Sequence, residues 1–229
     1  MKLRPVIFDW DGTIVDIDDR ERTSVNAALA SVGSPLLSIQ DFVKGYYSHP
    51  YKEAGSRMLL RKLLSNTNIV ERAIEAYSEE FAKTAKLTKL QRAAFGTLQA
   101  LKGRGVPLAV ATLRRSQALV EQEMKYLGID KFIEVIVTRE HINPELQKRP
   151  IFSIIAEVRA KQFAEALSLL QTKPLETMVV GDSWWDIRAA KKMRAISVWV
   201  KTGFGVYTDF SEEQPDIVLD SIDELLAHF

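Results

Sequence analysis

Short, continuously apolar segments recur along this 229-residue chain, and they constrain its fold more than any other feature. Strands buried on both faces of a parallel sheet have unbroken apolar runs, whereas half-exposed strands alternate apolar and polar residues. Four segments have the unbroken pattern, a fifth is a further candidate, and the last is a candidate edge strand: Pro5–Phe8, Pro107–Ala111, Phe132–Val137, Met178–Val180, Ile196–Val200 and Ile217–Leu219. The segments between them have helical patterns: Phe95–Lys102, Gln117–Leu127, Ile151–Leu170 and Asp186–Met193. This alternation predicts an α/β fold with a doubly wound parallel sheet.

Residues 18–90 interrupt the alternation between the first and second predicted strands. The segment has no convincing strand, and its pattern predicts four helices: Glu21–Val32, Ile39–Tyr47, Tyr51–Leu64 and Asn68–Lys86. About 70 residues of helix is too long for an ordinary crossover. We therefore expect two domains, an α/β core of residues 1–17 and 91–229 and an inserted helical cap of residues 18–90.

The composition argues against several classes of function. Thirty-one basic and 30 acidic residues give a net charge of +1, which argues against a nucleic-acid surface as the main function. Because the chain has no cysteine, disulfides, thiolate catalysis and zinc–thiolate sites are excluded. The sequence shows neither a signal-peptide pattern nor an apolar stretch of the roughly 18 residues that a membrane-spanning helix needs. We expect a cytoplasmic protein that binds neither a membrane nor nucleic acid.

Polar residues follow three of the predicted strands, at the point where each strand ends. Asp9 and Asp11 follow the first strand, Thr112 follows the second along the chain, and Asp182 follows Met178–Val180 after one glycine. In open α/β sheets, ligands collect at the carboxyl ends of the strands. We therefore expect these side chains to be neighbours in the folded protein.

The two carboxylates after the first strand suit phosphoryl transfer. Asp9 can attack phosphorus and form an acyl phosphate that water then hydrolyses. Asp11 can protonate the leaving oxygen and later deprotonate that water. Two anions beside a phosphoryl group need a cation, and Mg²⁺ with oxygen ligands supplies one. The alternative is a tight turn capped by carboxylates, since Asp and Gly are common in turns.

Two further motifs are ambiguous when each is taken alone. Asp182 would complete an all-oxygen magnesium site with Asp9 and Asp11, whereas Asp186 at a predicted helix start can be an N-cap. The hydroxyl of Thr112 can bind a phosphoryl oxygen, or it can cap the helix that follows.

Together these motifs resemble the haloacid dehalogenase (HAD) superfamily, in its phosphatase branch. The resemblance covers nearly the whole chain and rests on four stretches: Asp9–Asp16, Thr112, Gly181–Ala190 and Lys201–Gly205. The helical insert is similar to the cap of phosphoglycolate phosphatases and β-phosphoglucomutases. The resemblance therefore supports the doubly wound sheet with an inserted helical cap.

The resemblance also implies a role for each motif residue. Asp9 would be the nucleophile, Asp11 the general acid and base, and Thr112 a phosphate ligand. Asp9, Asp182 and the backbone carbonyl of Asp11 would bind Mg²⁺, and Asp186 would support the metal site. The implied activity is magnesium-dependent hydrolysis of a small phosphorylated metabolite through an aspartyl phosphate, similar to that of phosphoglycolate phosphatases.

The resemblance further implies a lysine near the start of the helix before Gly181, where it would offset charge between nucleophile and phosphate. Lys148 precedes Asp182 by 34 residues and Lys161 precedes it by 21. The resemblance implies a separation of roughly 20–25 residues, so about nine extra helical residues would carry Lys148 about 13 Å along the helix from the expected position, at about 1.5 Å per residue. We therefore favour Lys161 and keep Lys148 as the alternative. Either lysine can instead be a solvated surface residue, because most lysines are exposed.

Other functions stay open at this point. A sugar-phosphate mutase or phosphotransferase would use the same phosphorylated aspartate with a hydroxyl as acceptor in place of water. A non-catalytic binding protein of the same fold is the second alternative, although the intact set of carboxylates argues against it. Arg114 and Arg115, which follow Thr112, can face an anionic substrate or solvent.

Overall fold

The computed structural model describes residues 4–47, 55–142, 151–207 and 214–229. The chain forms two compact units, one of Met1–Asp16 with Leu90–Phe229 and one of Ile17–Lys89. No helix in these described ranges is long and apolar enough to cross a lipid bilayer.

A six-stranded parallel sheet forms the centre of the larger unit, in the order β5-β4-β1-β6-β7-β8. Its strands are β1 (Val6–Phe8), β4 (Leu108–Ala111), β5 (Val135–Val137), β6 (Met178–Gly181), β7 (Ile196–Val200) and β8 (Ile217–Leu219). The predicted α/β fold class with a parallel sheet is therefore confirmed. The predicted strand Phe132–Val137 is too long, because η2 (Asp130–Phe132) forms a 3₁₀ turn in which Phe132 N–H donates to Ile129 O.

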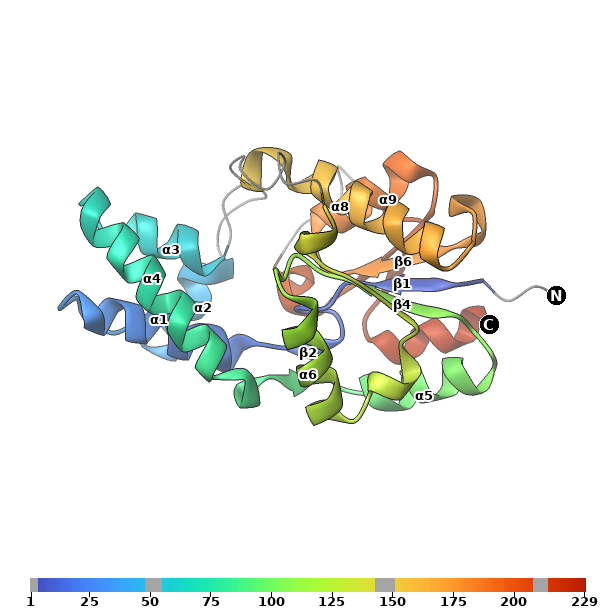
Figure 1. The fold of residues 1–229 in the computed structure, drawn as a ribbon, viewed down its shortest axis with the longest axis horizontal. Coiled ribbons are helices and arrows are strands. Elements are labelled where there is room, and N and C mark those ends of the chain that lie inside the picture. Colours follow the sequence, from blue (N-terminus) through green and yellow to red (C-terminus); the bar gives the residue numbers. More distant parts are fainter. Residues whose placement is uncertain (1–3, 48–54, 143–150, 208–213) are drawn as a thin grey trace. The chain divides into compact units, whose positions relative to one another are not determined.

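Helices cover both faces of this sheet (Figure 1). The helices α8 (Ile151–Leu169) and α9 (Trp184–Met193) pack on one face, and α5 (Ala94–Gly103) packs with η6 (Ile222–His228) on the other. The remaining elements of this unit are α6 (Gln117–Leu127), η3 (Arg139–His141), η4 (Pro174–Glu176) and η5 (Gly203–Val206). The apolar layer under α8 and α9 takes Ile7 from β1, Ala109 from β4 and Val179 from β6.

Strand β1 lies between β4 and β6. The sheet extends from β1 in both directions, through β4 and β5 on one side and through β6, β7 and β8 on the other. The register pairs Phe8 with Val110 on one side and with Val180 on the other. Asp9 therefore lies level with Ala111 and Gly181, the last residues of β4 and β6, and Thr112 and Asp182 follow one residue further along. Because side chains alternate along a strand, Asp9 points to the same face as Ile7, the face that α8 and α9 cover.

The smaller unit is helical, with α1 (Asp18–Ser31), α2 (Ile39–Tyr47), α3 (Ser56–Leu63), α4 (Thr67–Lys83) and η1 (Ala85–Leu87). Polar groups are buried among these helices. Arg20 donates to Phe81 O and to Thr88 Oγ1, and Glu21 accepts from Tyr77. Two short strands, β2 (Val15–Asp16) and β3 (Lys89–Leu90), pair with each other near the unit boundaries.

Candidate active site

Three buried carboxylates converge at the carboxyl edge of the sheet. Asp9 follows β1, Asp182 follows β6, and Asp186 lies in the first turn of α9. Each offers one oxygen, and these oxygens all lie within 4.8 Å of one another. Helix α9 begins at Trp184, earlier than predicted, so Asp186 is not an N-cap and its Oδ2 instead accepts from Ser183.

A fully buried arginine binds two of these carboxylates. Arg159 donates from Nη2 to Asp9 Oδ1 over 2.8 Å and from Nε to Asp186 Oδ1 over 2.6 Å. Its Nη1 donates to Ala111 O over 2.8 Å and to Gln162 Oε1 over 2.9 Å. The guanidinium also lies over the Phe163 ring, so its orientation is fixed by these hydrogen bonds and by the ring contact. It therefore presents a fixed positive charge beside Asp9.

The structure places Asp11 and Thr112 next to this cluster but with other partners. The carboxylate of Asp11 accepts two hydrogen bonds from Arg114, each of 2.7 Å. The hydroxyl of Thr112 accepts from Arg114 N–H over 3.1 Å. Ser116 caps α6, so Thr112 is not the N-cap of that helix.

The electrostatics of the cluster are dominated by burial and by the proximity of like charges. Burial raises the pKa of Asp9 well above 3.8, and the charge of Asp186 raises it further, while Arg159 acts in the opposite direction. Burial and Asp186 likewise raise the pKa of Asp182. Burial alone would lower the pKa of Arg159, but the charges of Asp186 and Asp9 outweigh burial and raise it. One guanidinium therefore does not neutralise three carboxyl groups.

Residues 6–200 match the family model of haloacid dehalogenase-like hydrolases. The chain belongs to this family. It is 28% identical over 99% of its length to pyrophosphatase PpaX of Bacillus mycoides (strain KBAB4), covering 96% of that protein. It is 25% identical over 97% of its length to phosphoglycolate phosphatase 1 of Pseudomonas aeruginosa, covering 78% of that protein. The resemblance inferred from the motifs is thus confirmed, and the protein is an enzyme of a hydrolase family.

A solved structure shows the same fold. The chain superposes on a haloacid dehalogenase-like family hydrolase from Streptococcus pneumoniae with a TM-score of 0.77 at 20% sequence identity. The match covers 99% of this chain and 98% of that one.

The donor set of this haloacid dehalogenase-like hydrolase fits a metal ion. Carboxylate oxygens are the ligands that hard divalent cations prefer, and the cluster keeps uncompensated negative charge. Two glycines leave room beside it, since a Cβ at Gly12 or at Gly203 would lie 2.2 Å from Asp182 Oδ2. The N–H of Phe204 orients the Asp182 carboxylate through a 2.8 Å bond to Oδ2. The buried cluster can therefore hold a cation.

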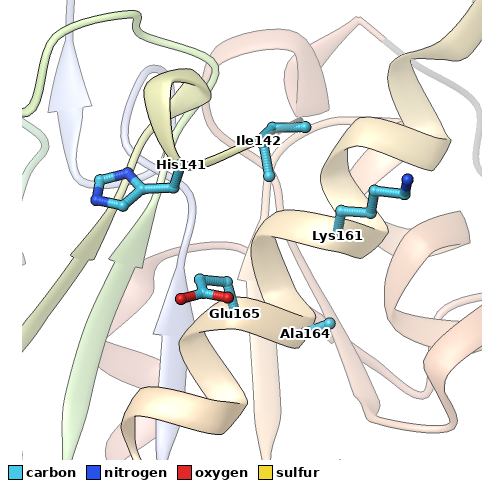
Figure 2. Close-up of a pocket in the computed structure, with 5 residues that line it drawn as sticks. All are labelled: His141, Ile142, Lys161, Ala164 and Glu165. Carbon is cyan, nitrogen blue, oxygen red and sulfur yellow. The ribbon is translucent and has the colours of Figure 1, made fainter. Parts of the chain in front are cut away.

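Lys161, the favoured lysine of the sequence analysis, lies outside this cluster. Its side chain is 48% exposed, and its Nζ lies 3.9 Å from Glu157 Oε1. Lys161 instead lines an open cavity of about 300 Å³ with His141 and Glu165, and its amine points away from His141 (Figure 2). Two residues along a helix turn the side chain through about 200°, so Lys161 and Arg159 cannot share a face. Lys148 lies outside the described residues.

The sequence analysis missed Arg159 because it searched for lysine alone. The available signal was helical spacing, since Arg159 stands four residues after Ile155 and four before Phe163, in the stripe of α8 that faces the sheet. A cation in such an apolar stripe must be paired, because burying an unpaired charge is costly.

Proposed function

We propose that this protein is a Mg²⁺-dependent phosphomonoester hydrolase that acts on a small phosphorylated metabolite through an aspartyl phosphate on Asp9. One observation carries the proposal. The carboxylate that follows β1 is held by a buried arginine and lies within 4.8 Å of two further buried carboxylates. The phosphatase names of the relatives support the same reaction class.

The nucleophile in this proposal is Asp9. Arg159 donates to its Oδ1, which leaves the second oxygen to attack phosphorus. Attack forms the Asp9 acyl phosphate and breaks the bond between phosphorus and the leaving oxygen. Water then attacks the phosphoryl group, which releases inorganic phosphate and restores the Asp9 carboxylate.

Asp11 moves the proton in both halves of the reaction. It gives a proton to the leaving oxygen in the first half and takes one from the attacking water in the second. Asp11 lies two residues after Asp9, beyond the end of the strand, and is 27% exposed, so a substrate can reach its carboxyl group.

Mg²⁺ would be held by Asp9, Asp182 and the backbone carbonyl of Asp11, with Asp186 supporting the site. When bound, it supplies positive charge that offsets repulsion between the carboxylates and the phosphoryl group. Arg159 takes the role that the resemblance gave to a lysine, because it is a preorganised donor beside the nucleophile. Thr112 would donate its hydroxyl to a phosphoryl oxygen.

The helical residues 18–90 would act as a cap domain that selects the leaving group.

The names of the relatives suggest phosphoglycolate and inorganic pyrophosphate as the first substrates to test. Both carry a second anionic group next to the scissile phosphate. We place the enzyme in the cytoplasm, in line with the sequence pattern.

The test is phosphate release from p-nitrophenyl phosphate, phosphoglycolate and pyrophosphate, with Mg²⁺ and with a chelator. The wild-type protein should release phosphate only with the metal, and Asp9→Asn should abolish turnover while the far-ultraviolet circular dichroism is unchanged. Asp223→Asn, an exposed carboxylate in η6, is the matched control. Turnover that persists in Asp9→Asn contradicts the proposal. Phosphoryl transfer to a sugar hydroxyl in preference to water would favour the mutase.

A further inference from the structure

The side chain of Arg114 grips the carboxylate of Asp11 with two parallel hydrogen bonds. Nε donates to Oδ2 and Nη2 donates to Oδ1, each over 2.7 Å. Such a pair of bonds between a planar guanidinium and a planar carboxylate fixes the orientation of both groups. The contact is well shielded, since the Arg114 side chain is only 13% exposed. Asp11 therefore has a defined direction.

Arg114 is itself held from behind by a buried carboxylate on α6. Its Nη1 donates to Oε1 of Glu123 over 3.0 Å, and the Glu123 side chain is 3% exposed. The backbone of Arg114 is fixed as well, because its N–H donates to Thr112 Oγ1 and its carbonyl accepts from Arg139 N–H. A chain of contacts thus runs from α6 through Arg114 to Asp11.

The side chain of Glu123 is 3% exposed, and a carboxylate buried to this degree is destabilising unless it is paired. Its partner Arg114 also binds the carboxylate of Asp11. Asp11 lies three residues beyond the end of β1 and directly before Gly12, a glycine at φ +87°. Without Arg114, no described hydrogen bond would hold the Asp11 carboxylate in place.

We propose that Arg114 is a positioning residue that orients the Asp11 carboxylate, and that Glu123 fixes the position of the Arg114 guanidinium. The inference rests on the proposed function, because it assigns the device that directs the general acid and base of that reaction. Arg114 acts through Asp11 and is separate from Arg159, which binds the nucleophile. General acid–base catalysis depends on such placement, since the proton must travel along a short hydrogen bond to the reacting oxygen.

The test measures kcat and KM for a series of phosphate monoesters, from p-nitrophenyl phosphate to an alkyl phosphate. Good leaving groups need little protonation, so the role of Asp11 is greatest for the alkyl ester. Arg114→Gln should lower kcat/KM for the alkyl phosphate by about 10- to 100-fold, a part of the roughly 10²- to 10⁴-fold that general acid–base catalysis contributes. It should lower kcat/KM for p-nitrophenyl phosphate by less than about 3-fold, because that leaving group needs little protonation.

Three further variants sharpen the test. Arg114→Lys keeps the charge but not the fork, so it should rescue only part of the loss. Glu123→Gln removes the charge behind Arg114 without touching Asp11, and it should give a smaller loss with the same dependence on the leaving group. Arg115→Gln changes the neighbouring exposed arginine and should match the wild type.

A double-mutant cycle gives the decisive comparison. If Arg114 acts through Asp11, Arg114→Gln should cost nothing more once Asp11→Asn is present. Equal losses of kcat/KM across all leaving groups, or a rise in KM with kcat unchanged, overturn the inference, since kcat/KM reports only the steps up to formation of the aspartyl phosphate. If the wild type is inactive on every ester with Mg²⁺, the proposed function fails and the inference fails with it. A variant that loses its cooperative thermal unfolding is replaced by Glu123→Gln, which tests the same chain of contacts.

Discussion

The guanidinium of Arg159 donates to the Asp9 carboxylate over 2.8 Å, between residues 150 positions apart in the sequence. The same side chain also binds Asp186. Through these two bonds it joins helix α8 to Asp9 at the end of β1 and to α9, the helix that follows β6. Arg159 therefore connects the packing of the core to the chemistry of the site.

Arg159→Gln should lower kcat by about 10²- to 10³-fold, because a preorganised cationic donor beside the nucleophile is lost. Arg159→Lys keeps a charge but cannot bind Asp9 and Asp186 with the same fork, so an intermediate loss is expected. Lys161→Gln is the control and should cost little, since Lys161 is half-exposed. Steady-state kinetics below the thermal midpoint of each variant checks this ranking. A large loss in Lys161→Gln with an active Arg159→Gln would contradict it.

Asp11→Asn should slow turnover of alkyl phosphates by about 10²- to 10⁴-fold, because the leaving oxygen then lacks a proton donor. The loss should be smaller for p-nitrophenyl phosphate, whose leaving group is stable as an anion. Rates measured over a series of leaving groups give the comparison. If the loss of kcat/KM, which reports only the first half of the reaction, were the same for all esters, protonation of the leaving oxygen by Asp11 would be contradicted.

Gly203→Ala should weaken the response of activity to Mg²⁺. A Cβ there would lie 2.2 Å from Asp182 Oδ2 and 2.7 Å from Gly12 Cα, so the carboxylate must shift. The control is Gly128→Ala, which also has positive φ but has no atom within 4 Å of the added carbon. Both variants carry the backbone strain of alanine at positive φ. Titration of activity with Mg²⁺ should shift to higher concentration in Gly203→Ala alone.

The stability of the metal-free protein should fall as pH rises above 3.8. Burial raises the pKa of Asp9 and Asp182, so the folded chain keeps protons that the unfolded chain has lost. Where the folded state binds more protons, the free energy of unfolding decreases with pH. The lowered pKa values of Asp19 and Asp216 act at and below 3.8, so they do not offset this fall.

Urea unfolding with a chelator and with Mg²⁺, over a series of pH values, measures this effect. Mg²⁺ binds the ionised carboxylates and should stabilise the protein increasingly as pH rises. Asp182→Asn should reduce the fall in the chelated protein. A chelated wild type whose unfolding free energy rises with pH over the same range would contradict the assignment.

The sheet could be predicted because its strands are buried on both faces and therefore have continuous apolar runs. Strand β7 (Ile196–Val200) and helix α6 (Gln117–Leu127) have the same bounds in the sequence analysis and in the structure. Carboxylates at strand ends were visible for the same reason, since each run stops at a polar residue. Among the strands the start of β5 differed most, where a local 3₁₀ turn replaces extended backbone. Helix α9 begins at Trp184, two residues before the predicted start.

The pairing of charges could not be predicted in the same way. The contact between Arg159 and Asp9 and the contact between Arg114 and Asp11 each join residues more than 100 positions apart. Neither pair follows from local spacing, because both depend on how a helix or loop packs against the strand ends. The structure was therefore needed to identify Arg159 as the cationic side chain beside Asp9.

The central claim is that Asp9 becomes phosphorylated, and trapping that intermediate tests it most directly. The protein is mixed with a phosphate monoester and Mg²⁺, quenched during turnover, and reduced with borohydride, which converts an aspartyl phosphate to homoserine. Peptide mass spectrometry should find homoserine at position 9 in the wild type and none in Asp9→Asn. Hydrolysis that proceeds with position 9 unmodified, or with the modification on another carboxylate, would contradict the account.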